Sequence, residues 1–230
     1  MSTRPTLDPA GALAAFGRAA YSDLTSVVAL SLVFSVAVIP VVTLGPAIIA
    51  VVAATHEGVT KRTAGGQTTE RERISIFIQT FRSEFRRGLL MTVLPIAVAV
   101  VTVWYAGTAI AGQSGPLLIG SILGVYAFIA TIAVTFRAAT LLTREGAPTT
   151  RQALWDAARH LLTEPAFSAL HVLFVGLVII LCAGLGIAVP LLLPGLLAVL
   201  EVVSYEETAG GGAIRVVKAY QGELLIEGES

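Results

Sequence analysis

Three long windows of the sequence contain no Asp, Glu, Lys or Arg, and these windows limit what the chain can fold into. They cover residues 24–55, 88–136 and 165–200, and inside them only His171 can titrate near neutral pH. With 13% charged and 55% hydrophobic residues, the chain is more apolar than a soluble domain, in which charged residues approach a quarter. The sequence therefore predicts an all-α, polytopic membrane helical bundle.

Each window is too long for one membrane helix. The windows hold 32, 49 and 36 residues, whereas a bilayer core about 30 Å thick takes about 20 helical residues. We predict about six spans as three hairpins, in one membrane domain over residues 1–208, followed by a polar, flexible tail over 209–230. The predicted spans cover residues 20–39, 46–62, 88–110, 117–139, 166–184 and 190–207.

The distribution of basic residues favours this even number of crossings. With six spans, all 15 lysines and arginines fall on one side of the membrane. The three opposite turns, near Thr43, Ser114 and Leu185, carry no charge. A single span in either outer window would divide the basic clusters between the two sides, against the positive-inside rule. We therefore predict a multi-pass protein of the cell membrane with both termini in the cytoplasm.

Two prolines and a glycine interrupt the first window in VIPVVTLGPA, residues 38–47. Pro40 lacks an amide hydrogen and should end the first helix. Gly45 can adopt unusual dihedrals, Pro46 suits the first turn of a helix, and the hydroxyl of Thr43 can cap exposed amides. The stretch predicts a tight turn; the alternative is a pair of broken helices that frame a substrate site, as in some transporters.

Two short patterns in the windows concern helix packing. PLLLPG, from Pro190 to Gly195, repeats the proline-to-glycine spacing of PVVTLG, from Pro40 to Gly45. GSILG, residues 120–124, has the small-xxx-small spacing that lets membrane helices approach closely. That spacing fits either close packing within the monomer or a dimer seam.

Both interior loops are predicted to carry an amphipathic helix at the cytoplasmic interface, over residues 70–87 and 150–163. Thr69 with Glu72, and Thr149 with Gln152, fit the capping box that starts a helix. In the first helix an apolar stripe recurs at helical spacing, opposite charged residues that include Arg73. The stripe consists of Ile74, Phe77, Ile78, Phe81 and Phe85. Two roles remain open for these helices, anchoring on anionic lipids and docking of a soluble partner.

His171 is the candidate polar position inside the windows, since an ionisable group in a membrane span suggests function. The alternative is a structural hydrogen bond to a neighbouring helix, with Ser168 and Thr102 as candidate partners. We expect no carboxylate deep in the spans, because Glu201 comes near a helix end; this disfavours a proton-coupled pump. The sequence has no phosphate-binding loop, zinc-binding histidine pair or nucleophile elbow. No catalytic residue, cofactor, metal or nucleic-acid partner is expected.

The order of these elements resembles the YesL family, membrane proteins of unknown function. The residues that carry the resemblance are Pro40, Thr43, Gly45, Pro46, Ala47 and Ala50 in the turn region, and Phe77, Phe81, Arg82, Phe85 and Arg86 in the following helix. The similarity covers about residues 20–140 and is looser beyond them. At Ser31 the family often carries an asparagine. The resemblance implies a topology and, as context, a link to sugar-uptake transporters, but no catalytic residue.

The sequence therefore predicts a noncatalytic accessory or scaffold protein, linked to carbohydrate uptake, with the lipid bilayer and a membrane transporter complex as its partners. The alternative is a small passive transporter or channel. The oligomeric state stays open. The candidate functional or structural residues are Pro40, Thr43, Gly45, Pro46, Phe77, Phe81, Phe85, Arg82, Arg86, His171, Pro190 and Gly195.

Overall fold

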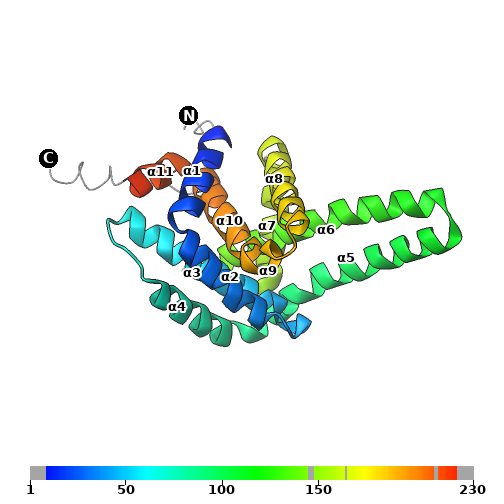
Figure 1. The fold of residues 1–230 in the computed structure, drawn as a ribbon, viewed down its shortest axis with the longest axis horizontal. Helices are drawn as coiled ribbons and strands as arrows, with labels where there is room; N and C mark the ends of the chain where they lie inside the picture. Colours follow the sequence, from blue (N-terminus) through cyan, green and yellow to red (C-terminus); the bar gives the residue numbers. More distant parts are fainter. Residues whose placement is uncertain (1–8, 145–147, 164, 210–211, 222–230) are drawn as a thin grey trace.

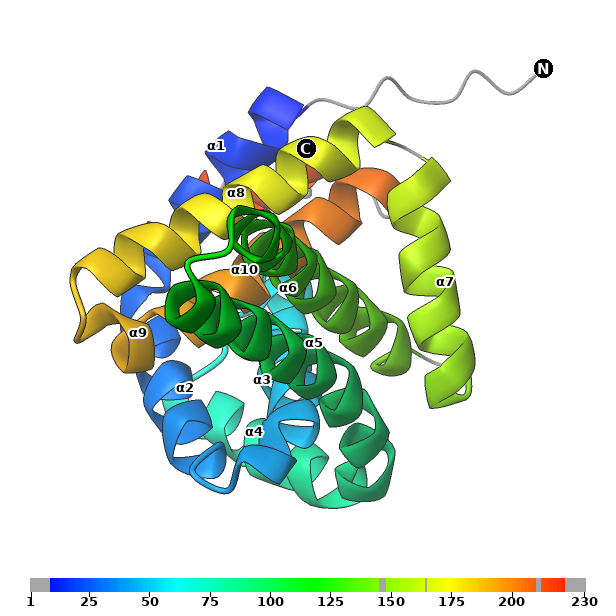
Figure 2. The same ribbon diagram turned by 90° about the vertical axis from the view of Figure 1, so that its right-hand side faces the viewer.

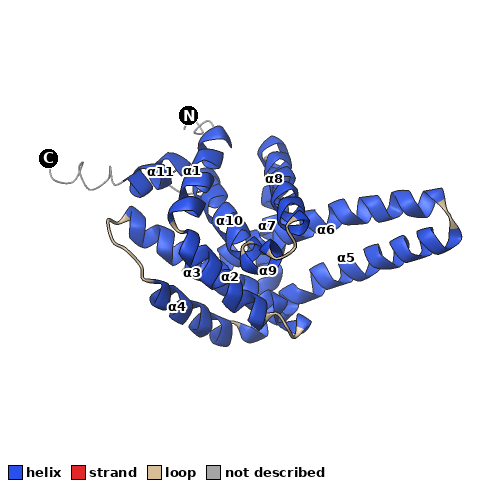
Figure 3. Cartoon of the chain, in the orientation of Figure 1, coloured by secondary structure: helices blue, strands red, loops and turns tan. Residues whose placement is uncertain are grey.

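The computed structural model describes residues 9–144, 148–163, 165–209 and 212–221, and within them the fold is entirely helical, which confirms the predicted class (Figure 3). The elements are α1 (Pro9–Ser22), α2 (Leu24–Ala37), the 3-10 turn η1 (Val41–Thr43), α3 (Leu44–Thr63), α4 (Glu70–Ser83), α5 (Phe85–Gly112), α6 (Gly115–Leu142), α7 (Thr150–Thr163), α8 (Pro165–Gly184), α9 (Ala188–Leu191), α10 (Leu193–Ala209) and α11 (Ala213–Gln221).

Helix α3 lies at the centre of a bundle from which the α5–α6 hairpin projects (Figure 1). Its residues from Ala47 to Val52 are at most 1% exposed. Helices α2, α4, α5, α6, α10 and α11 pack around it. The alanines of α3 leave room for these close neighbours. Figure 2 views the same arrangement with the tip of the hairpin toward the reader.

Three helical segments in the described residues are long and apolar enough to cross a membrane: Val41–Thr63, Phe85–Gly112 and Gly115–Leu142. Their environments differ. The apolar window of the first is 67% buried within the protein, whereas those of the other two are 17% and 11% buried. The first is thus a core helix, while α5 and α6 turn most of their apolar surface outward.

The number of candidate spans depends on how bent pairs of helices are counted. The described residues offer three candidates, or five if each of two bent pairs is one broken span. Helix α2 has 14 residues, and at about 1.5 Å per residue it falls short of a bilayer core about 30 Å thick. It qualifies only together with α1, across a bend of 81°. The number of crossings stays a prediction.

The close contact between Gly45 and Gly88 does not fit the predicted topology. A Cβ on Gly45 would lie 1.9 Å from the carbonyl oxygen of Gly88. The prediction placed Gly45 in an outer turn and Gly88 at the inner end of a span, which would put them on opposite faces of the bilayer. The reason is that α4 packs lengthwise on α2 and α3, with Phe77 and Arg73 buried, and returns the chain to the start of α3 (Figure 1).

The turn between α2 and α3 differs in its details from the prediction. Helix α2 ends at Ala37, before Pro40. The hydroxyl of Thr43 does not cap α3; it donates to the carbonyl oxygens of Pro40, at 2.6 Å, and of Ala37. Gly45 has helical rather than unusual dihedrals. Its N–H donates to Oγ1 of Thr92 at 2.8 Å, so this glycine serves a close helix contact.

The repeated proline-to-glycine spacing corresponds to a repeated contact. Gly195 lies in the first turn of α10, and its N–H donates to Oγ of Ser31 on α2 at 2.9 Å. A Cβ on Gly195 would lie 2.7 Å from the carbonyl oxygen of Val27. In both contacts a glycine near the start of a helix meets a Ser or Thr hydroxyl and the carbonyl oxygen four residues before it. Pro190, in α9, accepts a hydrogen bond from Ser35 at 2.8 Å.

The GSILG glycines are used within the hairpin. A Cβ on Gly120 would lie 2.8 Å from the ring of Tyr105, and one on Gly124 would lie 2.6 Å from Oγ1 of Thr102. Both neighbours belong to α5. The small-residue face of α6 therefore closes the α5–α6 seam.

Helices outside the predicted spans lie near both ends of the described chain, and the second of them, AIRVVKAYQ over residues 213–221, is a segment that the sequence allows to form a short helix. Helix α1 precedes a sharp corner at Asp23, where one span had been expected to begin at residue 20. Helix α11 lies in the predicted flexible tail and packs on α1 and α3. Residues 210–211 and 222–230 of that tail lie outside the described residues.

Replacing Gly45 by alanine tests the α3–α5 contact. The added methyl group would overlap a backbone oxygen that cannot rotate away, so we expect Gly45→Ala to lower the free energy of unfolding by about 3 kcal/mol, at the upper end of overpacking costs. Thermal unfolding in mild detergent measures the effect. The control is Gly107→Ala, because a Cβ there meets nothing within 4 Å. A Gly45→Ala protein as stable as Gly107→Ala would contradict this account.

Candidate functional site

A buried cluster of charged and polar side chains joins α6, α8 and α10. Arg137 of α6, His171 of α8, and Glu201 and Ser204 of α10 are all less than 9% exposed. Because Glu201 and Ser204 are three residues apart, they occupy the same face of α10. His171 reaches both of them from α8. This is the candidate functional site.

Glu201 occupies the centre of the cluster, between two basic groups. Its Oε1 lies 2.6 Å from Nε of Arg137, and its Oε2 lies 3.3 Å from Nε2 of His171. The other imidazole nitrogen, Nδ1, lies 3.0 Å from Oγ of Ser204. The four groups thus form a continuous chain from a guanidinium to a hydroxyl.

Arg137 is held by further contacts along α10. Its Nη1 donates to Oγ1 of Thr208 at 3.1 Å, and its guanidinium lies 5.3 Å from the ring centroid of Tyr205. The guanidinium of Arg144, which follows the end of α6, lies 4.1 Å from the centroid of the same ring and 3.5 Å from a carboxylate oxygen of Glu206. The α6–α10 seam is therefore polar. A buried ion pair of this kind is costly to break from one side.

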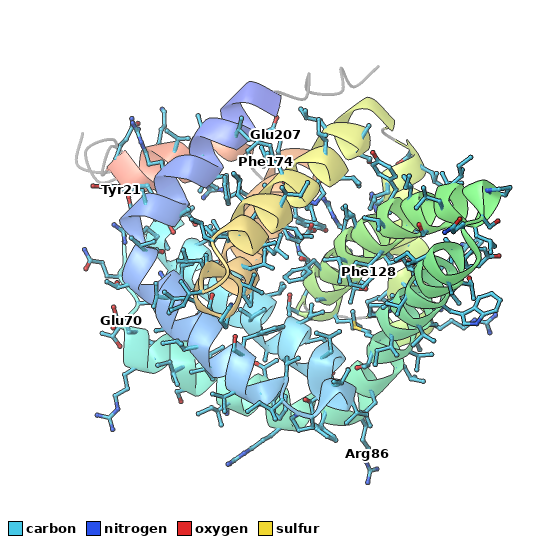
Figure 4. All side chains as sticks on the ribbon, turned by 45° about the vertical axis from the view of Figure 1, so that its right-hand side comes forward. Tyr21, Glu70, Arg86, Phe128, Phe174 and Glu207 are labelled. Carbon is cyan, nitrogen blue, oxygen red and sulfur yellow. The ribbon has the colours of Figure 1, made fainter. Side chains whose placement is uncertain are left out.

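A small cavity borders the polar chain between α1, α8 and α10. Its volume is about 130 Å³, and it opens to the surface of the protein. The edge-to-face contact of Phe16 with Phe174, at 5.9 Å between ring centroids, joins α1 to α8 beside it; Phe174 is labelled in Figure 4. The residues that line the cavity are Ala12, Leu13, Leu170, His171, Phe174, Leu200 and Ser204. An apolar cavity with a few convergent polar groups has the character of a ligand site.

Ser204, His171 and Glu201 also have the order of hydroxyl, imidazole and carboxylate found in serine hydrolases. Two features distinguish them from that machinery. The hydroxyl here faces Nδ1 and the carboxylate faces Nε2, the reverse of the hydrolase arrangement. Ser204 also lies inside α10, where the backbone N–H groups bond along the helix and cannot bind an oxyanion. The geometry favours hydrogen bonding over acyl transfer.

A second buried cluster centres on Asp23, at the corner between α1 and α2. Its Oδ1 accepts from Arg62 at 3.2 Å, and its Oδ2 accepts from Arg73 at 2.7 Å and from the hydroxyl of Tyr220 at 2.8 Å. One carboxylate thereby connects the α1–α2 corner to α3, α4 and α11. Gly58 makes room for it, because a Cβ there would lie 2.5 Å from the guanidinium of Arg73.

The remaining predicted residues do not join the cluster around Glu201. Phe77 is buried against the bundle and stacks on Phe81, which in turn contacts Phe85. Arg82 and Arg86 are exposed, and Arg86 points away from the protein in Figure 4. Pro40, Thr43, Gly45 and Pro46 belong to the α2–α3 turn region, while Pro190 and Gly195 hold α9 and α10 to α2.

Several members of the two clusters were missed or misjudged from the sequence. The expected partners of His171 were Ser168 and Thr102, but the observed ones are Ser204 and Glu201. Glu201 was expected near a helix end, but it lies in the middle of α10 and is 1% exposed inside the bundle. The signal available was that Arg137 and Glu201 each directly end a charge-free window.

Arg73 was assigned to the charged outer face of its helix, whereas it is 3% exposed and pairs with Asp23. Both predicted capping boxes are present. Thr69 Oγ1 accepts from the N–H of Glu72 at 3.3 Å. Thr149 and Gln152 bond reciprocally, with side-chain-to-backbone distances of 3.1 and 3.4 Å.

One comparison with known proteins gives a match. Residues 25–108 match the family described as "Protein of unknown function, DUF624". The matched segment runs from α2 into α5 and includes the Gly45–Gly88 contact, but neither Arg137 nor Glu201. No curated protein and no solved structure matches the chain.

Removing Arg137 tests the ion pair. We expect Arg137→Met to lower the free energy of unfolding by about 3–5 kcal/mol, because it leaves the buried Glu201 carboxylate without its main counter-charge. The double variant Arg137→Met/Glu201→Leu should recover part of that loss, as measured by thermal unfolding in detergent. The control is Arg87→Gln at an exposed pair with Glu84, worth less than about 1 kcal/mol. A double variant no more stable than Arg137→Met would count against the pair.

Replacing Tyr220 tests the docking of α11. Burial, and then the charge of Asp23, raise the pKa of Tyr220 above its ordinary value of 10.0. The stabilisation from this hydroxyl is therefore complete below pH 10.0 and is lost as the pH rises toward the folded-state pKa. We expect Tyr220→Phe to lower the free energy of unfolding by about 1 kcal/mol near neutral pH. In alkaline solution, the difference in this free energy between Tyr220→Phe and the parent protein should become smaller.

Unfolding measured across this pH range gives the comparison, with Tyr21→Phe as the control because Tyr21 is 83% exposed. A constant difference between Tyr220→Phe and the parent protein at every pH would contradict the assignment.

Proposed function

We propose that the protein is a noncatalytic membrane accessory or scaffold protein, which enters the cell membrane through α5–α6 and docks there onto a transporter complex for carbohydrate uptake. The observation that carries this proposal is the outward apolar surface of the hairpin, whose windows are only 17% and 11% buried. A membrane helix needs such a surface to contact lipid or the span of another protein.

The hairpin has the length and surface of a membrane element. Each of its helices has 28 residues, or about 42 Å at 1.5 Å per residue, enough to cross the bilayer core. Its exposed large apolar residues include Leu90, Val93, Val100, Val101, Val103, Trp104, Ile110, Leu118, Ile119, Ile122, Leu123, Val125 and Tyr126.

Charge supports an orientation for the hairpin. Arg86 and Arg87 lie at the start of α5, and Arg144 follows the end of α6, while the tip around Gln113 and Ser114 is uncharged. By the positive-inside rule, the base of the hairpin faces the cytoplasm. Since Gly45 contacts Gly88, the beginning of α3 belongs to the same side, and the bundle lies with both termini at the cytoplasmic face.

The link to carbohydrate uptake depends on the resemblance to the YesL family, and the match of residues 25–108 to a family of unknown function is compatible with it. The assignment to YesL is part of the proposal. The second half of the chain, which contains α6 to α11, lies outside the matched residues.

The second candidate is a small passive transporter or channel. The buried Arg137–Glu201–His171 cluster favours it, since ionisable groups inside apolar helical bundles often line solute pathways. Solute flux into proteoliposomes distinguishes the two functions, with His171→Ala as the probe variant. A flux that His171→Ala abolishes would favour transport over the accessory role.

A photoreactive amino acid placed on the hairpin tests the accessory role in cells. At Val103 or Ile119, which are 71% and 61% exposed, we expect a discrete adduct that contains a sugar-transporter component, because a docked span would cover these positions. The control position is Ile180 on α8, which is 65% exposed and apolar but lies outside the hairpin. Mass spectrometry identifies the adducts, and deletion of the protein should reduce sugar uptake. Lipid adducts alone at all three positions, with unchanged uptake, would overturn the proposal.

A further inference from the structure

We propose that the cavity between α1, α8 and α10 binds an uncharged aliphatic alcohol, and that the Ser204–His171 pair accepts a hydrogen bond from the hydroxyl of this ligand. The proposal adds a small-molecule site to the docking function. It does not depend on the hairpin or on any partner protein.

The size and walls of the cavity define the body of the ligand. A volume of about 130 Å³ approaches that of cavities of about 150 Å³ that bind benzene in protein interiors. Walls such as Leu13, Leu170 and Phe174 are apolar and come from two helices. A chain of about six carbons fills such a space, and the opening allows a longer chain to extend outward.

The polar chain beneath the cavity defines the head of the ligand. The carboxylate of Glu201 lies 3.3 Å from Nε2 of His171 and can only accept, so its charge favours the neutral tautomer that carries the proton on Nε2 and leaves Nδ1 as an acceptor. The hydroxyl of Ser204 then donates to Nδ1. Its oxygen keeps its lone pairs for a further bond, so the site selects a ligand that donates a hydrogen bond.

Charge excludes ionised ligands of either sign. Arg137 and Glu201 compensate each other at 2.6 Å, and a further buried charge would need its own counter-ion. An uncharged hydroxyl needs none. The chemistry therefore favours an alcohol over a fatty acid, an amine or an ether of the same shape.

Two photoreactive probes test this selectivity on purified protein in nanodiscs: a hexanol with a diazirine on its chain, and the methyl ether of the same compound. We expect the alcohol to label the cavity walls and to reach half-maximal labelling at a concentration about five- to tenfold lower than the ether, because the ether cannot donate to Ser204. Ser204→Ala should remove this difference. Peptide mapping by mass spectrometry locates the labelled residues.

Two further variants keep the test decisive. Ser121→Ala is the matched control, because Ser121 is a buried helical serine whose hydroxyl donates to the carbonyl oxygen of Leu118 at 2.7 Å, away from the cavity; it should keep the preference for the alcohol. Ala12→Phe fills the cavity from α1 without touching the polar chain, and should abolish labelling of its walls by both probes. This variant decides the matter if Ser204→Ala does not fold.

Equal labelling by the alcohol and the ether in the parent protein would overturn the proposal. A preference for the alcohol that survives Ser204→Ala, or wall labelling that survives Ala12→Phe, would overturn it as well.

Discussion

The direct contact between the starts of α3 and α5 is the constraint from which the rest of the arrangement follows. At Gly45 and Gly88 two backbones meet with no side chain between them. For the chain to return from the end of α3 to this point, α4 must run the full way back along the bundle. That path helps to bury α3, and α5 and α6 project together beyond the bundle (Figure 1).

A second contact of the same design fixes the last long helix. Gly195 meets Ser31 as Gly45 meets Thr92: an N–H in the first turn of one helix bonds to a hydroxyl on another. Such hydroxyls satisfy amides that a helix start leaves unpaired. In apolar surroundings this is valuable, because an unpaired amide there costs about 2–7 kcal/mol. The two contacts clamp α3 and α10 to their neighbours at the same kind of position.

The sequence was informative where local chemistry decides the structure. Charge-free windows gave the helical class, and both capping boxes are formed as predicted. It was less informative where a residue pairs across the fold. The arginines at positions 73 and 137 carry no local sign that their partners are Asp23 and Glu201, which are 50 and 64 residues away in the sequence. Helical periodicity predicts which face of a helix carries a side chain. It does not show that a buried carboxylate of another helix packs against that face.

The same distinction explains why hydropathy alone cannot count the membrane helices. Hydropathy measures how poorly a segment suits water, and α3 and α5 both pass that test. It cannot distinguish a helix covered by protein from a helix covered by lipid, because both environments are apolar. Only the packing separates them: 67% of one window is buried inside the protein and 17% of the other. The charged residues are distributed in the same way. The buried ion pairs lie among the packed helices, whereas residues 88–136 of the hairpin contain no charged residue.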